Sequence, residues 1–325
     1  MAKAKVLVTG IIPEQGLTGL QNTFNVTYSP DKPFSREWVL EHLHEYDGLL
    51  LMGLKADKEL IDAGTNLKII TANGVGFDHI DIDYAQERGI VVANAPQGVR
   101  IPTAEMTIAL MLATVRHLHE YDKIVRSGNW VDVSEPKYMG MSLGGKTLGV
   151  FGMGRIGSTV GEFAQVLGMK VIYNDVHQLD ADLEKKLNVK YVDFNTLVKE
   201  SDVITLHAPS LPSTEGKFNS DVFKQMKDTA YIINAARGSL IKQNDLIDAL
   251  KNDIIAGAGL DVYETEPNVP ESLRELDNVI MSPHAGTGTL GARIAIAEEA
   301  SGNLISLLKD GKAKNMVNKV TKYMD

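Results

Sequence analysis

The sequence predicts an α/β protein with two doubly wound parallel-sheet domains. The main observation is an alternation along the chain, in which short apolar runs rich in β-branched residues are followed by helical segments. This alternation is typical of parallel sheets with helices on both faces. The second observation is length, because 325 residues are enough for two domains that each bury a core. The third is a glycine-rich turn between a strand and a helix at 152–157.

The first domain is predicted from the N-terminal third of the chain. Its expected helices cover 35–44 and 58–63, and we expect it to end near 96–100. Its expected strands are 5–10, 48–53, 67–74 and 90–96. No repeat or low-complexity tract interrupts this pattern, so it predicts one small doubly wound domain.

The glycine-rich turn has the spacing of a dinucleotide-binding fingerprint. Gly152 allows a sharp turn, Gly154 lets the backbone approach a pyrophosphate, and Gly157 lets the helix pack close to the strand. The amides of Arg155 and Ile156 would lie at a helix N-terminus, which favours phosphate. The turn therefore predicts a Rossmann-type domain.

The strand expected after this helix, 169–174, ends at Asp175. An acid at this place accepts hydrogen bonds from a ribose 2′-hydroxyl, and its charge repels the 2′-phosphate of NADP. We therefore predict NAD as the cofactor.

Between the two domains, Pro102 begins a helix expected to continue to about His119. Residues 120–146 show little periodicity and include Trp130, Met139 and Met141. Such residues on an irregular arm indicate a subunit interface, and the alternative is a loop packed on its own core.

After the fingerprint, strands are expected at 147–151, 169–174, 190–193, 202–207, 230–235, 256–262 and 278–282. A long helix begins the tail, and its expected role is to cross back and cover the first domain. We therefore expect a discontinuous domain of residues 1–100 and 288–325, with residues 101–287 inserted in it.

The composition excludes several functional classes. The formal net charge of −9 argues against nucleic acid or an anionic membrane as the partner. The chain has no cysteine, which excludes disulfides and a thiol nucleophile and suits a cytoplasmic protein. No signal peptide is visible, and no apolar segment is long enough to cross a bilayer. We expect no metal site, because the pairs His42 with His44 and His117 with His119 have a spacing that separates the rings on a helix.

Three residues past expected strand ends form a candidate catalytic set. Arg237 could hold a 2-oxo acid in a bidentate manner, and His284 could donate a proton. Glu266 could orient His284 and raise its pKa. Taken alone, each has an ordinary alternative: Arg237 could be a surface ion-pair partner, His284 a structural histidine and Glu266 a solvated loop acid.

Asp261 could accept a hydrogen bond from a nicotinamide carboxamide or belong to a turn. His79 and His207, also at strand ends, are expected only to support the site.

Seven motifs in order make the chain resemble the NAD-dependent D-isomer-specific 2-hydroxyacid dehydrogenases over nearly its whole length. They are ANGVGFDHID at 72–81, PTAEMTIALML at 102–112, FGMGRIG at 151–157, LHAPS at 206–210, INAARGSLI at 233–241, AGLDVYETEP at 258–267 and SPHAG at 282–286.

The resemblance implies a Rossmann NAD-binding domain inserted in a flavodoxin-like substrate domain. It implies that Arg237 clamps the substrate, His284 is the acid/base, Glu266 orients it, and the amides of Val75 and Gly76 bind the substrate carboxylate. It also implies a homodimer in which the 120–146 arm embraces the partner, and a cleft that closes over the ligands. The residues implied to line the cofactor are Gly152, Gly154, Arg155, Ile156, Gly157, Asp175, Ala208, Pro209, Thr214, Ala235, Ala236 and Asp261.

Within the family, the glyoxylate and hydroxypyruvate reductases look nearest, because small residues follow His284. Leu51, Met52 and Leu54 would make an apolar wall, so pyruvate and phenylpyruvate remain open as substrates. A phosphite dehydrogenase is an alternative, although its lysine position is Val75 here. A non-catalytic, NAD-sensing corepressor-like protein is the other.

Overall fold

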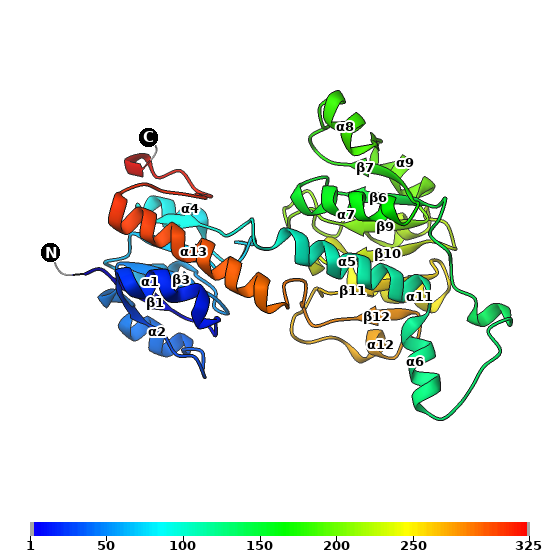
Figure 1. The fold of residues 1–325 in the computed structure, drawn as a ribbon, viewed down its shortest axis with the longest axis horizontal. Helices are drawn as coiled ribbons and strands as arrows, with labels where there is room; N and C mark the ends of the chain where they lie inside the picture. The colour runs from blue at the N-terminus through cyan, green and yellow to red at the C-terminus, as the bar shows by residue number, and fades with distance from the viewer. Residues whose placement is uncertain (1–2, 324–325) are drawn as a thin grey trace. The chain divides into compact units, whose positions relative to one another are not determined.

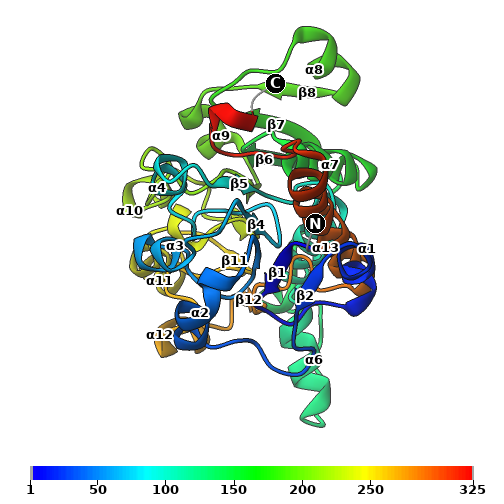
Figure 2. The ribbon, with the colours of Figure 1, turned by 90° about the vertical axis from the view of Figure 1, so that its left-hand side faces the viewer.

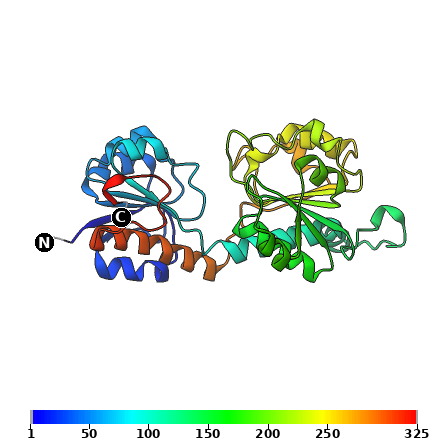
Figure 3. The same ribbon diagram turned by 90° about the horizontal axis from the view of Figure 1, so that it is seen from above.

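The computed structural model describes residues 3–323, which form two compact units. The first unit contains the residues up to Pro102 together with those from Thr287 onward, and the second contains Thr103–Gly286. Each unit has a parallel β-sheet with helices on both faces (Figure 3). This confirms the predicted fold class of two parallel-sheet α/β domains.

The sheet of the first unit has the strand order β2-β1-β3-β4-β5, and every neighbouring pair is parallel. This is the order of flavodoxin-like sheets. Its strands are β1 (Lys5–Val8), β2 (Asn25–Thr27), β3 (Gly48–Leu51), β4 (Ile69–Ala72) and β5 (Val91–Ala93). Four of these were predicted. The sequence analysis missed β2, because this three-residue edge strand is partly exposed and has no apolar run.

Helices cover both faces of this sheet (Figure 2). One face carries α2 (Arg36–His42), α3 (Lys58–Ala63) and α4 (Ile82–Glu87), and the other carries α1 (Thr18–Thr23) and α13 (Leu290–Asp310). Gly48 on β3 shows how closely α13 packs, because a Cβ there would lie 2.7 Å from Cδ2 of Leu304. The tail helix expected from the sequence therefore lies on the first sheet.

The C-terminal segment after α13 covers the edge of this sheet at β5. Met316 forms an antiparallel bridge with Ala93, and the Val317 amide donates to the carbonyl of Val92. The side chain of Asn318 accepts a hydrogen bond from the Val92 amide and donates one to the Ile90 carbonyl. These contacts satisfy backbone groups that would otherwise be open to pairing with another chain.

The sheet of the second unit has the parallel order β12-β11-β10-β9-β6-β7-β8. The strands β7 and β8 follow β6 on one side, and β9 to β12 follow on its other side, so the order of the strands switches between β6 and β9. Rossmann-type sheets bind dinucleotides at this switch point. All seven strands were predicted: β6 (Thr147–Phe151), β7 (Lys170–Asn174), β8 (Val189–Tyr191), β9 (Val203–Leu206), β10 (Tyr231–Asn234), β11 (Gly257–Leu260) and β12 (Val279–Met281).

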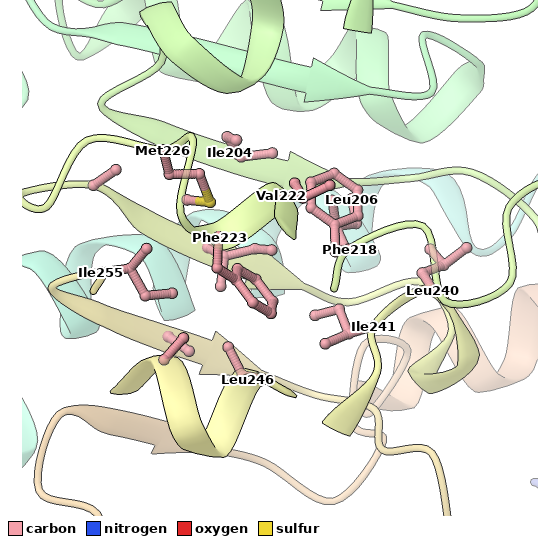
Figure 4. Close-up of a cluster of buried hydrophobic side chains, with 14 of the residues drawn as sticks. Ile204, Leu206, Phe218, Val222, Phe223, Met226, Leu240, Ile241, Leu246 and Ile255 are labelled. Atoms are coloured by element: carbon pink, nitrogen blue, oxygen red, sulfur yellow. The ribbon is translucent and has the colours of Figure 1, made fainter. Parts of the chain in front are cut away.

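Two apolar clusters hold helices on this sheet. One cluster joins it to α5 (Arg100–Val115) and α7 (Arg155–Val166). The other, shown in Figure 4, has Phe218 and Phe223 among its buried side chains. It includes residues of α9 (Phe194–Glu200), α10 (Ser220–Phe223), α11 (Gln243–Lys251) and α12 (Glu271–Arg274). A further helix, α8 (Ala181–Leu187), precedes β8.

The arm between α5 and β6 differs from the prediction. His117 has a left-handed backbone with φ of 53°, which ends α5 and begins a separate helix, α6 (Leu118–Arg126). The expected single helix to about His119 was therefore wrong, and so was the irregular start of the arm at 120. From 127 to 146 the segment contains one short 3₁₀ helix, η3 (Pro136–Tyr138), and it extends away from the body of its unit (Figure 1). In the part of the chain that the structure describes, no helix is long and apolar enough to cross a membrane.

Candidate active site

His284 and Glu266 form a hydrogen-bonded pair in the second unit. Nδ1 of His284 lies 2.8 Å from Oε2 of Glu266, and the other carboxylate oxygen of Glu266 accepts from the Tyr263 amide at 3.0 Å. The hydrogen bond from Glu266 raises the pKa of His284, although burial opposes it. Burial would raise the pKa of Glu266, but the hydrogen bonds from His284 and Tyr263 outweigh it and lower that pKa. The pair therefore favours a protonated imidazole beside an ionised carboxylate.

The loop that carries His284 is built around the buried carboxylate of Asp261. Asp261 is 1% exposed and follows β11. Its oxygens accept hydrogen bonds from the Ser282 hydroxyl at 2.6 Å and from the amides of Ala285 and Gly286 at 2.7 Å. Its carbonyl accepts from the amide of His284, which has a left-handed backbone with φ of 53°. Since these bonds hold both flanks of His284, Asp261 sets the direction of its imidazole.

Arg237 follows β10 and belongs to a loop that packs against the Glu266 loop. A Cβ on the next residue, Gly238, would lie 1.9 Å from the carbonyl carbon of Tyr263, so only glycine permits this approach. The guanidinium donates to the Ala236 carbonyl at 2.7 Å. Its charge lowers the pKa of both Glu266 and His284, although for neither group is it the main influence. Arg237, Glu266 and His284 thus lie near one another at the carboxyl ends of β10, β11 and β12.

The glycine-rich turn has the geometry of a dinucleotide site. A Cβ on Gly152, whose φ is 98°, would lie 2.7 Å from the Ala208 amide nitrogen, and one on Gly157 would lie 2.1 Å from the carbonyl of Gly152. A Cβ on Gly154 would meet no protein atom within 4 Å, so the protein's own packing does not require glycine there. No side chain caps the N-terminus of α7, where Arg155 and Ile156 lie. The residues present therefore fit a bound pyrophosphate.

Asp175, after β7, is hydrogen-bonded to this turn. One carboxylate oxygen accepts from the Met153 amide at 2.6 Å, and the other accepts from the His177 amide at 3.0 Å. A carboxylate has about four acceptor positions, so two remain for a ribose. The bond to Met153 was not expected from the sequence, because it depends on how the turn folds over the end of β7.

The other expected cofactor residues lie in the loops after β9 and β10. Ala208 and Ala235 are buried, Ala236 is partly buried, and Pro209 is exposed. Thr214 is buried, and its hydroxyl donates to the Pro209 carbonyl at 2.7 Å and accepts from the Leu211 amide. The Thr214 hydroxyl therefore holds its own loop.

In the first unit, Val75 and Gly76 follow β4, at the carboxyl end of the sheet. Val75 is 37% exposed, which leaves its backbone within reach of a small ligand. The expected apolar wall needs one correction, because Leu51 is 0% exposed and belongs to the core below. Met52 and Leu54, which follow the end of β3, are partly exposed.

Comparisons with known proteins agree with this geometry. Residues 108–286 match the family model described as the NAD binding domain of D-isomer specific 2-hydroxyacid dehydrogenase. The chain is 41% identical to the glyoxylate reductase of Thermofilum pendens over 98% of this chain and 96% of that protein. The chain belongs to the D-isomer-specific 2-hydroxyacid dehydrogenase family.

Two solved structures of reductases are similar in fold to this chain. The crystal structure of a glyoxylate reductase from Paecilomyes thermophila has a TM-score of 0.88 and 31% identity, over 98% of this chain and 99% of that one. An NADPH-dependent glyoxylate/hydroxypyruvate reductase from Sinorhizobium meliloti, in complex with NADP and malonate, has a TM-score of 0.86 and 29% identity, over 100% and 99%. The family is therefore shown, and with it an NAD(P) cofactor.

The pKa of His207 is shifted in the opposite direction to that of His284. His207 follows β9 next to the glycine-rich turn, and its buried Nε2 has no hydrogen-bond partner among residues 3–323. Burial lowers the pKa of His207 to about 3, so its imidazole stays neutral near neutral pH. A neutral imidazole can support the turn, but it is not suited to donate a proton near neutral pH.

Proposed function

We propose that this chain is an NAD-dependent reductase that converts 2-oxo acids to D-2-hydroxy acids, and reverses the reaction with the oxidised cofactor. The observation that carries the proposal is the 2.8 Å hydrogen bond between His284 and Glu266, in loops next to that of Arg237. The names of the relatives support glyoxylate and hydroxypyruvate as the first substrates to test. Pyruvate and phenylpyruvate remain in the same class.

In the proposed reaction, the bound nicotinamide supplies the hydride. The protein binds the negatively charged substrate and donates the proton. Arg237 binds the carboxylate and carbonyl oxygens of the substrate through its planar fork, which holds the carbonyl polarised. His284 donates a proton to the oxygen that becomes the hydroxyl. Glu266 keeps that imidazole protonated and oriented before transfer. In the reverse direction, neutral His284 accepts the hydroxyl proton.

We assign the cofactor to the second unit, and we assign to the first unit two backbone amides that bind the substrate carboxylate. The glycine-rich turn and the uncapped α7 support the pyrophosphate site, and Asp175 supports the adenosine ribose. The amides of Val75 and Gly76 support the carboxylate site. This division corresponds to a substrate domain of residues 1–100 and 288–325 and a cofactor domain of residues 101–287.

We propose a preference for NAD(H) over NADP(H), which differs from the cofactor of the Sinorhizobium meliloti reductase. The argument is the negative charge of Asp175, which would face a 2′-phosphate. Replacing Asp175 with Ala should narrow the difference between NADH and NADPH. It should do so mainly by weakening NADH, because the Met153 amide also loses its acceptor. The exposed Asp180 is the matched control, since Asp180→Ala should leave both affinities unchanged.

NADH oxidation measured with glyoxylate, hydroxypyruvate, pyruvate and phenylpyruvate tests the reaction. We expect turnover with at least one, and a fall of a hundredfold to ten-thousandfold in His284→Ala, which is the usual contribution of a general acid. Activity with none of the four, or full activity without the imidazole, would refute the proposal.

We also propose a homodimer formed through the arm. Trp130 is 87% exposed, Val133 60% and Met139 54%, and all three lie on the segment that extends from the unit. Large apolar side chains gathered on one exposed segment are typical of a protein interface.

A further inference from the structure

The loop after β4 contains two adjacent backbone amides, those of Val75 and Gly76. Among the described residues, the structure records no hydrogen-bond acceptor for the amides of Val75 and Gly76. The proposed function assigns these amides to the substrate carboxylate, and the inference below rests on that function. Two adjacent amides bind a carboxylate well only if both peptide planes are held in place.

Both peptide planes are held through their carbonyl groups. The side-chain amide of Asn94 donates to the Val75 carbonyl at 2.8 Å, and the Ala95 amide donates to the Gly74 carbonyl at 2.8 Å. These are trans peptides, in which C=O and N–H point in opposite directions. Drawing the two carbonyls toward Asn94 and Ala95 therefore directs the amides of Val75 and Gly76 away from them. Gly74 permits this with a φ of 156°, which other residues rarely adopt.

Asn94 is itself fixed by the C-terminal part of the chain. It is 7% exposed, its carbonyl accepts from the Asn303 side chain at 2.8 Å, and its amide donates to the Asn315 carbonyl at 3.2 Å. Asn315 in turn donates to the Asn303 side-chain oxygen at 3.1 Å. The network links α13 and the segment covering β5 to the loop after β4.

We infer that Asn94 is a positioning residue for the substrate: Asn303 and Asn315 hold its backbone, and its buried side chain orients the peptide that carries the Gly76 amide, which together with the Val75 amide binds the carboxylate. The position needs a neutral side chain that donates a hydrogen bond. An aspartate would place an acceptor against the Val75 carbonyl, and a leucine would leave that carbonyl without a donor. Either change removes the hydrogen bond that holds the peptide between Val75 and Gly76, and neither change alters the residues around His284.

The test uses the full-length chain with Asn94→Asp and Asn94→Leu, which keep the approximate size of the side chain. We expect KM for the best 2-oxo acid to rise on the order of tenfold to a hundredfold, because a hydrogen bond to a charged group is lost or weakened. The turnover number should change much less, because the carboxylate is bound equally in the ground and transition states. NADH affinity should stay within about twofold, because the glycine-rich turn belongs to the second unit.

Asn318→Leu is the matched control. The Asn318 side chain is also buried and also links the C-terminal segment to β5, through the Val92 amide and the Ile90 carbonyl, and neither of these hydrogen bonds goes to the 74–76 loop. It should lower the melting temperature about as much as Asn94→Leu and leave KM near the wild-type value. An equal rise of KM in this control, or unchanged KM in both Asn94 variants, would overturn the inference.

Binding of oxamate to the NADH-loaded protein separates this inference from the proposed reaction. Oxamate has the carboxylate and carbonyl of a 2-oxo acid, and calorimetry measures its affinity without turnover. Weaker oxamate binding in the Asn94 variants, together with no turnover of any 2-oxo acid by the wild type, would refute the reaction and support the loop assignment. Equal oxamate affinity in wild type and Asn94 variants, or no binding to the wild type, would refute the assignment itself.

Discussion

The hydrogen bond between His284 and Glu266 sets the pH range in which the imidazole can donate a proton. In the proposed reaction the protonated imidazole is the donor, so we expect activity below the pKa of His284 and its loss as pH rises through that pKa. Glu266→Gln removes the interaction that raises this pKa. We therefore expect the loss of kcat/KM for 2-oxo acid reduction to begin at lower pH than in the wild type, in a pH–rate profile.

A neighbouring acid provides the control for this profile. Glu264 lies in the same loop and accepts a hydrogen bond from the Gln243 amide at 3.2 Å. Glu264→Gln should leave the profile in place. If the profiles of Glu266→Gln and the wild type coincide, Glu266 does not set the protonation of His284.

Asp261 is expected to matter for stability as well as for rate. Asp261→Ala leaves the Ser282 hydroxyl and the amides of Ala285 and Gly286 without their acceptor. We expect a loss of about 2–4 kcal/mol in the free energy of unfolding, because several donors lose their partner in a buried site. Chemical denaturation measures this loss, and a rate assay should show a lower kcat because the His284 loop is released.

The exposed Asp277 is the comparison for Asp261. Its side chain is 83% exposed and only ion-pairs with Lys123, so Asp277→Ala should change stability by no more than about 0.5 kcal/mol. A similar small effect in Asp261→Ala would show that the loop keeps its shape without the carboxylate.

Some single-residue features could be predicted from the sequence and others could not. Arg237, Glu266 and His284 are chemically suited residues that follow predicted strands, so residue type and position were enough to propose them. The three hydrogen bonds of Asp261 and the Asn94 contact depend on how loops distant in sequence meet. The sequence alone gives no signal for such contacts.

At the scale of elements, the packing of α7 against its strand should depend on Gly157. A Cβ there would lie 2.1 Å from the Gly152 carbonyl oxygen, so Gly157→Ala must push the helix and the turn apart. We expect NADH affinity to fall by at least tenfold in a fluorescence titration, since the pyrophosphate site is built from both.

Gly161 on the same helix is the control for this change. Its Cβ would make only ordinary contacts, 3.4 Å from Cγ1 of Val171 and 3.7 Å from Cε of Met153. Gly161→Ala should keep NADH affinity and raise stability by up to about 1 kcal/mol, because alanine favours a helix. Equal NADH affinity in the two variants would contradict the role given to Gly157.

Most elements with a strong apolar pattern were predicted, and the elements that were not predicted have physical features that explain why. The buried parallel strands of the second sheet read as apolar runs and were found, and the short, partly exposed edge strand β8 was also predicted. The edge strand β2 is short and half-exposed, and its order comes from pairing with β1. In α6, Leu118, Tyr121 and Val125 have helical spacing, but no side chain of this helix is buried, so no core contact of its own unit accompanies that pattern.

For the whole molecule, the arm predicts a particle of twice the chain mass of 35.5 kDa. Sedimentation velocity on the wild type should show this dimer. A variant with Trp130→Ser, Val133→Ser and Met139→Ser should dissociate, because these side chains are the most exposed apolar groups of the segment from 127 to 146.

A variant at Val166 tests whether replacing any exposed apolar side chain dissociates the dimer. Val166 is 86% exposed at the end of α7, outside the arm, so Val166→Ser should leave the dimer intact. A wild-type chain that sediments as a monomer would contradict the proposed interface.

The covering of β5 by the C-terminal segment has a consequence during protein synthesis. A ribosome makes β1 to β5 first, then the continuous stretch Thr103–Gly286, and only at the end α13 and residues 315–318, which complete the first unit. We therefore expect the later-made second unit to mature before the earlier one, since its whole sequence emerges sooner. A truncated chain that ends at Gly286 and has been released from the ribosome should already bind NADH, while its N-terminal strands, which lack α13 and residues 315–318, should bind chaperones or aggregate.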